Sequence, residues 1–257
     1  MRRRFTTEEA FKGLRFWLKW VCLSGAALVF LAGARPAFGQ DNWEVYRKAI
    51  NDASIYNRNK VLPLRLLSPQ NGQVLVVTFT NYAYPDGPYP KPYHIPDGVY
   101  IWVTGDGEVG GICKQFHLSG EALKIRLNQL LGLKPDTAYT TFVVLSVPAD
   151  RVFRPTPDPN PAQVMPCSDP TSSQCGNVFP SGVPSDYFSF FANQSISSYR
   201  IGQLPAENGY PWTHLGYTYD WAPYKATKYG ASEYVIKPGT DASIVNKVKM
   251  DDYCNAP

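Results

Sequence analysis

The chain has 257 residues, 44% of them hydrophobic, and its 25 Lys and Arg face 21 Asp and Glu. Seven of the basic residues and two of the acidic ones fall in the first 39 positions, so residues 40–257 carry 18 basic against 19 acidic residues, a net charge of −1. Binding to nucleic acid needs a concentrated basic surface, so we expect no nucleic-acid partner.

The first 39 residues have the three parts of a secretory signal peptide. A basic stretch ends at Lys19, a 13-residue apolar run follows at 21–33, and Ala37-Phe38-Gly39 gives a small-x-small cleavage pattern. A membrane-spanning helix needs about 20 apolar residues, and an uncleaved anchor is the alternative interpretation. We expect residues 1–39 to be removed and 40–257 to form a single globular extracytoplasmic domain, secreted or periplasmic, with no membrane contact after cleavage.

Four cysteines remain after the signal peptide, and an even number in an exported protein favours two disulfides. We predict one bridge that closes a short loop, Cys167–Cys175, and hence a second, Cys113–Cys254. A zinc site is the competing interpretation. The chain has no CxxC pair, and its three histidines do not have the spacing of metal ligands, so we expect no metal ion and no cofactor.

Residue patterns predict the first elements in chain order. Apolar residues three and four apart indicate a helix over 42–56, and β-branched residues indicate a strand over 73–80. Five prolines and two glycines make 82–98 an irregular loop. A second strand covers 99–104 and is followed by a turn.

The second half of the chain continues this mixture. Ser119 can cap a helix that runs to about Leu131, and a strand follows over 139–147. Eight prolines make 154–184 a long loop, which we expect to be ordered and fastened by the Cys167–Cys175 bridge rather than to link two domains. A helix begins at Ser185.

The last predicted feature is a hairpin of strands 231–236 and 242–248. Strand, helix and strand in succession admit either a right-handed crossover or an antiparallel sheet with a helix on one face. The sequence therefore predicts one α+β domain: a mostly antiparallel sheet, two or three helices and a long proline-rich, disulfide-closed loop.

The densest group of unusual residues is the segment 209–221, GYPWTHLGYTYDW. Tyrosine and tryptophan combine rigid apolar area with one polar tip, which suits ligand recognition. A tightly packed core segment is the alternative interpretation, since these side chains are often buried. The candidate ligand-binding residues here are Trp212, Thr213, Tyr217, Tyr219 and Trp221.

Three residues are candidates for proton transfer. His214 titrates near neutral pH, and Asp220 and Glu233 could act as acid and base on a glycosidic bond. Glu233 could equally face solvent from its strand. Arg200 could hold an anionic group such as a phosphate or could be an ordinary surface arginine.

Four stretches resemble one family of secreted bacterial proteins. They are RLNQLLGLKPD at 126–136, VFRPTPDP at 152–159, PWTHLGYTYDW at 211–221 and GASEYVI at 230–236. The LGYTYDW segment followed by an SE(Y/F)V strand is the mark of this resemblance, which implies export but no particular activity. A looser similarity links the same end of the chain to terminal modules of bacterial toxins, some of which cleave NAD or transfer ADP-ribose.

These observations favour a secreted protein that binds a small-molecule, saccharide or peptide ligand through the segment 209–221. The alternative is a secreted hydrolase or transferase that acts on a glycosidic or N-glycosidic, NAD-like bond. The enzyme hypothesis expects Arg200, Asp220 and Glu233 to converge on one cleft with the aromatic residues. The binding hypothesis expects exposed, coplanar rings and no carboxyl group with a perturbed pKa.

Overall fold

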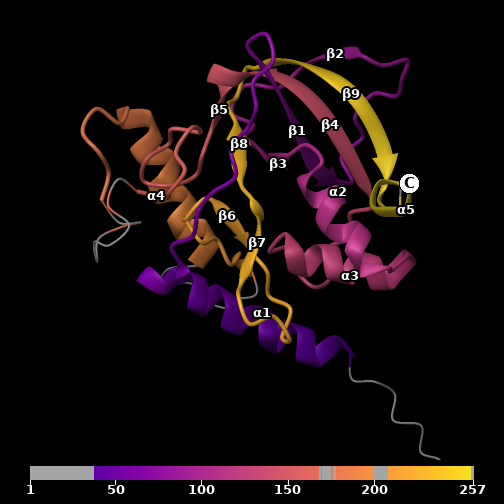
Figure 1. The fold of residues 1–257 in the computed structure, drawn as a ribbon, viewed down its shortest axis with the longest axis vertical. Coiled ribbons are helices and arrows are strands. Elements are labelled where there is room, and N and C mark those ends of the chain that lie inside the picture. Colours follow the sequence, from indigo (N-terminus) through magenta and orange to yellow (C-terminus); the bar gives the residue numbers. More distant parts are fainter. Residues whose placement is uncertain (1–37, 168, 170–174, 176–177, 200–207, 256–257) are drawn as a thin grey trace, which may run out of the picture. The chain divides into compact units, whose positions relative to one another are not determined.

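The computed structural model describes residues 38–167, 169, 175, 178–199 and 208–255. The predicted signal peptide lies almost entirely outside these residues, and so does Arg200. The described part is one α+β domain, as the sequence predicted (Figure 1). Its α-helices are α1 (Phe38–Ser54), α2 (Glu108–Cys113), α3 (Gly120–Leu130), α4 (Ser185–Tyr199) and α5 (Met250–Asn255).

A seven-stranded sheet in the order β2-β9-β4-β1-β3-β8-β5 forms the centre of the domain, and all its neighbouring strands pair antiparallel. The strands are β1 (Gln73–Thr80), β2 (Lys91–His94), β3 (Ile101–Gly105), β4 (Thr141–Pro148), β5 (Val152–Phe153), β8 (Tyr234–Ile236) and β9 (Asp241–Lys249). A second sheet pairs β6 (Tyr217–Tyr219) with β7 (Tyr229–Ser232).

Alternation along β1 separates two cores, because successive strand residues point to opposite faces. Val74 and Val76 belong to a cluster that also contains Ile236 of β8 and Ile244 of β9. These two strands lie far apart in the sheet order, so the sheet is strongly curved, and Figure 1 shows β4 and β9 as long bent arrows.

The other face of the sheet is covered by α2, α3 and α5. Val77 and Phe79 of β1 pack there with a leucine stripe of α3 at helical spacing, Leu123, Leu127 and Leu130. The disulfide Cys113–Cys254 joins α2 to α5 in this cluster and confirms the predicted pairing. The predicted helices and the strands over 73–80, 99–104 and 139–147 are confirmed as α1, α3, α4, β1, β3 and β4.

The described residues of 154–184 form no helix or strand, and the predicted bridge Cys167–Cys175 is present. A fully buried arginine, Arg154, fastens the start of this loop. Its guanidinium donates to the carbonyl oxygens of Gly216 (3.1 Å) and Arg65 (2.7 Å) and to the hydroxyl of Tyr234 (2.6 Å). The loop therefore packs on the segment that contains the candidate site.

Two details of the expected topology are wrong. The residues after Gly230 do not form a hairpin with β9, because β8 pairs with β3 and β5 whereas β9 pairs with β2 and β4. The loop over 82–98 also contains a short strand, β2, at the edge of the sheet. Both differences concern pairing partners, which local residue patterns do not specify.

Candidate functional site

Glu233 lies where the chain passes from one sheet to the other. The strand expected over 231–236 is interrupted at this residue: Ser232 pairs with Tyr217 in the small sheet, and Tyr234 pairs with Val103 in the large one. The amide of Glu233 donates to the carbonyl oxygen of Gly216 at 2.9 Å instead of to a ladder partner. Because the strand is interrupted here, the carboxyl group of Glu233 points into a cavity instead of toward solvent.

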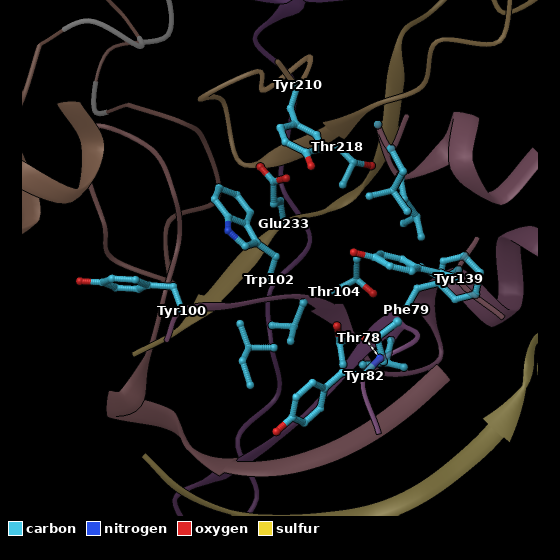
Figure 2. Close-up of a pocket in the computed structure, with 18 of the residues that line it drawn as sticks. Thr78, Phe79, Tyr82, Tyr100, Trp102, Thr104, Tyr139, Tyr210, Thr218 and Glu233 are labelled. Atoms are coloured by element: carbon cyan, nitrogen blue, oxygen red, sulfur yellow. Dashed lines mark hydrogen bonds between the residues drawn. The ribbon is translucent and has the colours of Figure 1, made fainter. Parts of the chain in front are cut away.

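The cavity has a volume of about 560 Å³ and lies among β1, β3, α4 and the segment after Gly209. Aromatic rings make up much of its wall, as Figure 2 shows for several of them. The carboxyl group of Glu233 points into the space between the rings of Tyr210 and Trp102 (Figure 2). The aromatic lining residues are Phe79, Tyr82, Tyr84, Tyr93, Tyr100, Trp102, Tyr139, Phe142, Tyr210, Trp212 and Tyr219.

Polar lining groups are few and mostly neutral. Hydroxyl and amide groups come from Thr104, Thr218, Gln194 and Ser197, among others. Among the described lining residues, Glu233 is the only carboxylic acid, and no lysine, arginine or histidine is present. The cavity thus combines a large apolar surface with one acidic group, a common composition of ligand sites.

Burial raises the pKa of Glu233 to about 8. Removal from water disfavours the charged form of a carboxyl group, and this cause outweighs the opposite effects of the Arg154 charge and the Trp212 indole N–H. Oε2 is enclosed and accepts no hydrogen bond of good geometry from the described residues. Glu233 therefore carries a proton at neutral pH while the cavity contains no charged ligand.

A hydrogen-bonded pair lies behind Trp212. The hydroxyl of Tyr199, at the end of α4, is 2.6 Å from the carbonyl oxygen of Trp212 and 2.7 Å from Nδ1 of His214. A carbonyl oxygen can only accept, so the phenol donates to Trp212 and receives the Nδ1 proton of His214. Nε2 of His214 is then unprotonated, and it is buried with no hydrogen-bond partner among the described residues.

His214 does not line the cavity. Burial lowers the pKa of its imidazole to about 4, and the charge of Lys60 acts in the same direction. The imidazole is therefore neutral over the physiological range. His214 instead has a positioning role: its hydrogen bond orients the Tyr199 hydroxyl, which in turn holds the backbone of Trp212.

Asp220 is engaged elsewhere. Its carboxylate forms a bidentate ion pair with Arg126 of α3, at 3.0 and 2.6 Å, and accepts the amide of Ala222 at 3.1 Å. Both side chains are buried, and neither lines the cavity. The structure thus does not bring Asp220 and Glu233 into one pocket, and Asp220 holds the small sheet to α3.

No protein-family model, curated protein or solved structure matches this chain. The family resemblance inferred from LGYTYDW therefore remains a prediction. Two further findings concern only the residues that the structure describes: no helix there is long and apolar enough to cross a membrane, and no cluster of three or more His, Cys, Asp or Glu could hold a metal ion. The two disulfides fit an oxidising compartment.

The predicted ligand-binding residues divide into two groups. Trp212 and Tyr219 line the cavity with Glu233. Thr213, Tyr217 and Trp221 do not line it: their polar atoms donate to the carbonyl oxygens of Tyr217, Lys60, and Asn128 and Leu133, respectively. All five side chains are nevertheless buried, so Trp212 and Tyr219 are packed residues that also border the cavity.

The residues of β3 are the main part of the site that the sequence did not indicate. Trp102 and Thr104 of β3, and Tyr100 just before the strand, all line the cavity. Aromatic residues two positions apart share one face of a strand, so this spacing carried a signal. Gln194 and Ser197 of α4 also line the cavity. The sequence gave no signal for them, since polar residues on a helix usually lie at the surface.

Proposed function

We propose that this protein binds a small ring-containing ligand in the cavity beside Glu233. The observation that carries the proposal is the composition of the cavity: about 560 Å³ lined largely by aromatic rings, with one partly buried glutamate. Its volume falls in the range of small-molecule sites. A saccharide ring or an aromatic ring would stack on these walls and form hydrogen bonds with the threonine, glutamine and carboxyl groups.

The rim of the cavity supports the same function. Tyr82, Val99, Tyr100 and Tyr210 line it and are each more than 40% exposed. Exposed apolar side chains that gather at one opening commonly mark a binding site. Ligand binding would cover them.

A matched pair of tyrosines tests the proposal. Tyr210 is exposed and lines the cavity, whereas Tyr224 is exposed and does not. Each ring faces one cation, Lys134 Nζ at 5.1 Å and the Arg126 guanidinium at 5.8 Å. We expect Tyr210→Ala to weaken binding about tenfold, the effect of losing one well-placed aromatic contact, and Tyr224→Ala to leave it unchanged.

The measurement is calorimetry or ligand-observed NMR with a panel of mono- and disaccharides, nucleosides and short peptides. Binding that is lost in Tyr210→Ala alone supports the cavity. Equal loss in both variants, or binding indifferent to both, places the ligand elsewhere and overturns the proposal. The absence of any binding across the panel also counts against it.

Hydrolysis or transfer at a glycosidic or N-glycosidic bond is a second candidate function, favoured by one observation. A carboxyl group that stays protonated at neutral pH in a cleft is suited to general acid catalysis, and Glu233 has this property. Since Asp220 is bound to Arg126, the scheme would rest on Glu233 alone.

Turnover assays separate the two candidates. Chromogenic glycosides and a fluorescent NAD analogue would be incubated with the wild-type protein, Glu233→Gln and the exposed control Glu121→Gln. Catalysis by Glu233 predicts product formation that Glu233→Gln reduces at least about 100-fold and Glu121→Gln does not. A wild-type protein that binds a ligand of the panel without turnover excludes the enzyme hypothesis.

A further inference from the structure

We infer that the ligand of this cavity carries a positive charge, as a protonated or quaternary amine, next to Glu233. The inference rests on the proposed function, since it names the chemical class of the ligand in the same cavity. It begins with the charges around the cavity: Glu233 is the only carboxylic acid of the described lining, which contains no lysine, arginine or histidine. An anionic ligand would find no partner charge there.

The walls next to Glu233 suit a cation as well. Trp102 and Trp212 lie nearly perpendicular, at 85° with 6.4 Å between ring centroids, and the Tyr210 ring lies on the other side of the Glu233 carboxyl group (Figure 2). Aromatic faces attract ammonium groups through their quadrupole, and tryptophan does so most strongly. Rings on several sides of an acidic group form the arrangement that recognises amines.

The charged and titratable groups near Glu233 come from several elements. Arg154, after β5, and Tyr199, at the end of α4, are the described titratable groups that interact electrostatically with it. Arg154 does not line the cavity, its guanidinium is held by carbonyl oxygens, and it also interacts with Glu108. Tyr199 is neutral, because burial raises the pKa of its phenol. Lys134 lies over the Tyr210 ring, so this ring already accepts one cation.

Binding of a cation requires the carboxylate form of Glu233. Since burial keeps Glu233 protonated at pH 7, a cationic ligand displaces close to one proton when it binds. A neutral ligand of the same shape displaces none. The proton count therefore distinguishes the two kinds of ligand independently of affinity.

The probes are choline and its uncharged carbon isostere 3,3-dimethyl-1-butanol, which have nearly the same shape. At pH 9 we expect choline to bind the wild-type protein at least about tenfold more tightly. At pH 7 this preference shrinks by about a factor of ten, since each pH unit below the pKa of Glu233 costs one decade of affinity. Calorimetry at pH 7 in buffers of different ionisation enthalpy should record the release of close to one proton.

Glu233→Gln should abolish both the proton release and the pH dependence, while the control Glu121→Gln keeps them. Equal binding of the two probes at pH 9, or choline binding at pH 7 without proton release, overturns the inference. If saccharides of the panel bind in a Tyr210-dependent way while choline does not, the inference fails and the proposed function stands. If no probe or panel ligand binds, both fail.

Discussion

Glu233 and His214 both lie next to Trp212, and their pKa values respond to burial in opposite ways. Glu233 has its pKa raised to about 8 and His214 has its pKa lowered to about 4. The cause is the same, because burial disfavours whichever form is charged. At neutral pH both side chains are therefore uncharged, and Trp212 has no charged group from either of them beside it.

The signs of these shifts predict how stability depends on pH. Glu233 binds its proton more tightly when folded, so its contribution is fully present below pH 4.5 and is lost as pH rises through about 8. His214 binds its proton less tightly when folded, so its contribution is present above pH 6.5 and is lost as pH falls through about 4. The two effects cancel between about pH 4.5 and 6.5, so their joint contribution to stability is greatest over this range and falls as pH rises above it.

Urea unfolding from pH 4 to 9 checks this prediction. Glu233→Gln should flatten the alkaline limb and stabilise the protein at pH 9 by a few kcal/mol, at about 1.4 kcal/mol per pKa unit. Glu121→Gln, at an exposed position, should leave the limb unchanged. An alkaline limb that persists in Glu233→Gln would show that Glu233 is not the group whose pKa is raised.

At the scale of elements, the small sheet is held against α3 by a close approach at Gly230. A Cβ atom there would lie 2.2 Å from Thr218 Oγ1 and 2.4 Å from the carbonyl oxygen of Leu130. Thr218 Oγ1 donates to that same carbonyl oxygen at 2.7 Å and accepts the amide of Ala231 at 2.8 Å. Only glycine fits this crossing of β6, β7 and α3.

Gly230→Ala should therefore destabilise the domain by about 3 kcal/mol, the upper range of overpacking costs when backbone must move. Gly111→Ala is the matched control: it lies in α2 and a Cβ atom there meets nothing within 4 Å, so we expect a gain of up to about 1 kcal/mol. Thermal or urea unfolding of the two variants measures both effects. Equal stabilities of the variants would contradict the close approach.

Elements that depend on local pattern could be predicted from the sequence, and the partners of those elements could not. The β-branched run over 73–80 and the leucine stripe of α3 correspond to β1 and α3 because their periodicity is a local property. The hairpin after Gly230 failed because β8 and β9 each find partners far away in the chain. Pairing of this kind depends on the whole sheet.

The same distinction explains the candidate site. The sequence indicated Glu233 only as a possible acid–base partner of Asp220, with a solvent-facing position as the alternative. The partner of Asp220 is Arg126, 94 residues away. The residues around Asp220 therefore could not show whether its carboxylate belongs to an ion pair or to an active site. Trp102 reaches the cavity from β3, and only the fold brings that strand beside the aromatic segment.

For the whole molecule, the two disulfides differ in what they connect. Cys113–Cys254 joins α2 to α5 across 141 residues and lies within the core on the helical face of the sheet. Cys167–Cys175 closes a separation of only eight residues inside the proline-rich loop. In the chain-entropy account a bridge stabilises by restricting the unfolded chain, and more so for a longer loop.

Removing either bridge should therefore lower the free energy of unfolding, and by a different amount for each. That account gives about 5 kcal/mol for a loop of the Cys113–Cys254 length and about 2.5 kcal/mol for the Cys167–Cys175 length. The first double alanine variant also loses sulfur atoms packed in the core, so we expect it to unfold at clearly lower urea concentration than the second. Urea unfolding of both variants, with the wild-type protein before and after reduction, measures the difference. If the Cys167→Ala, Cys175→Ala variant proves the less stable of the two, the proline-rich loop contributes more to the fold than its chain entropy accounts for.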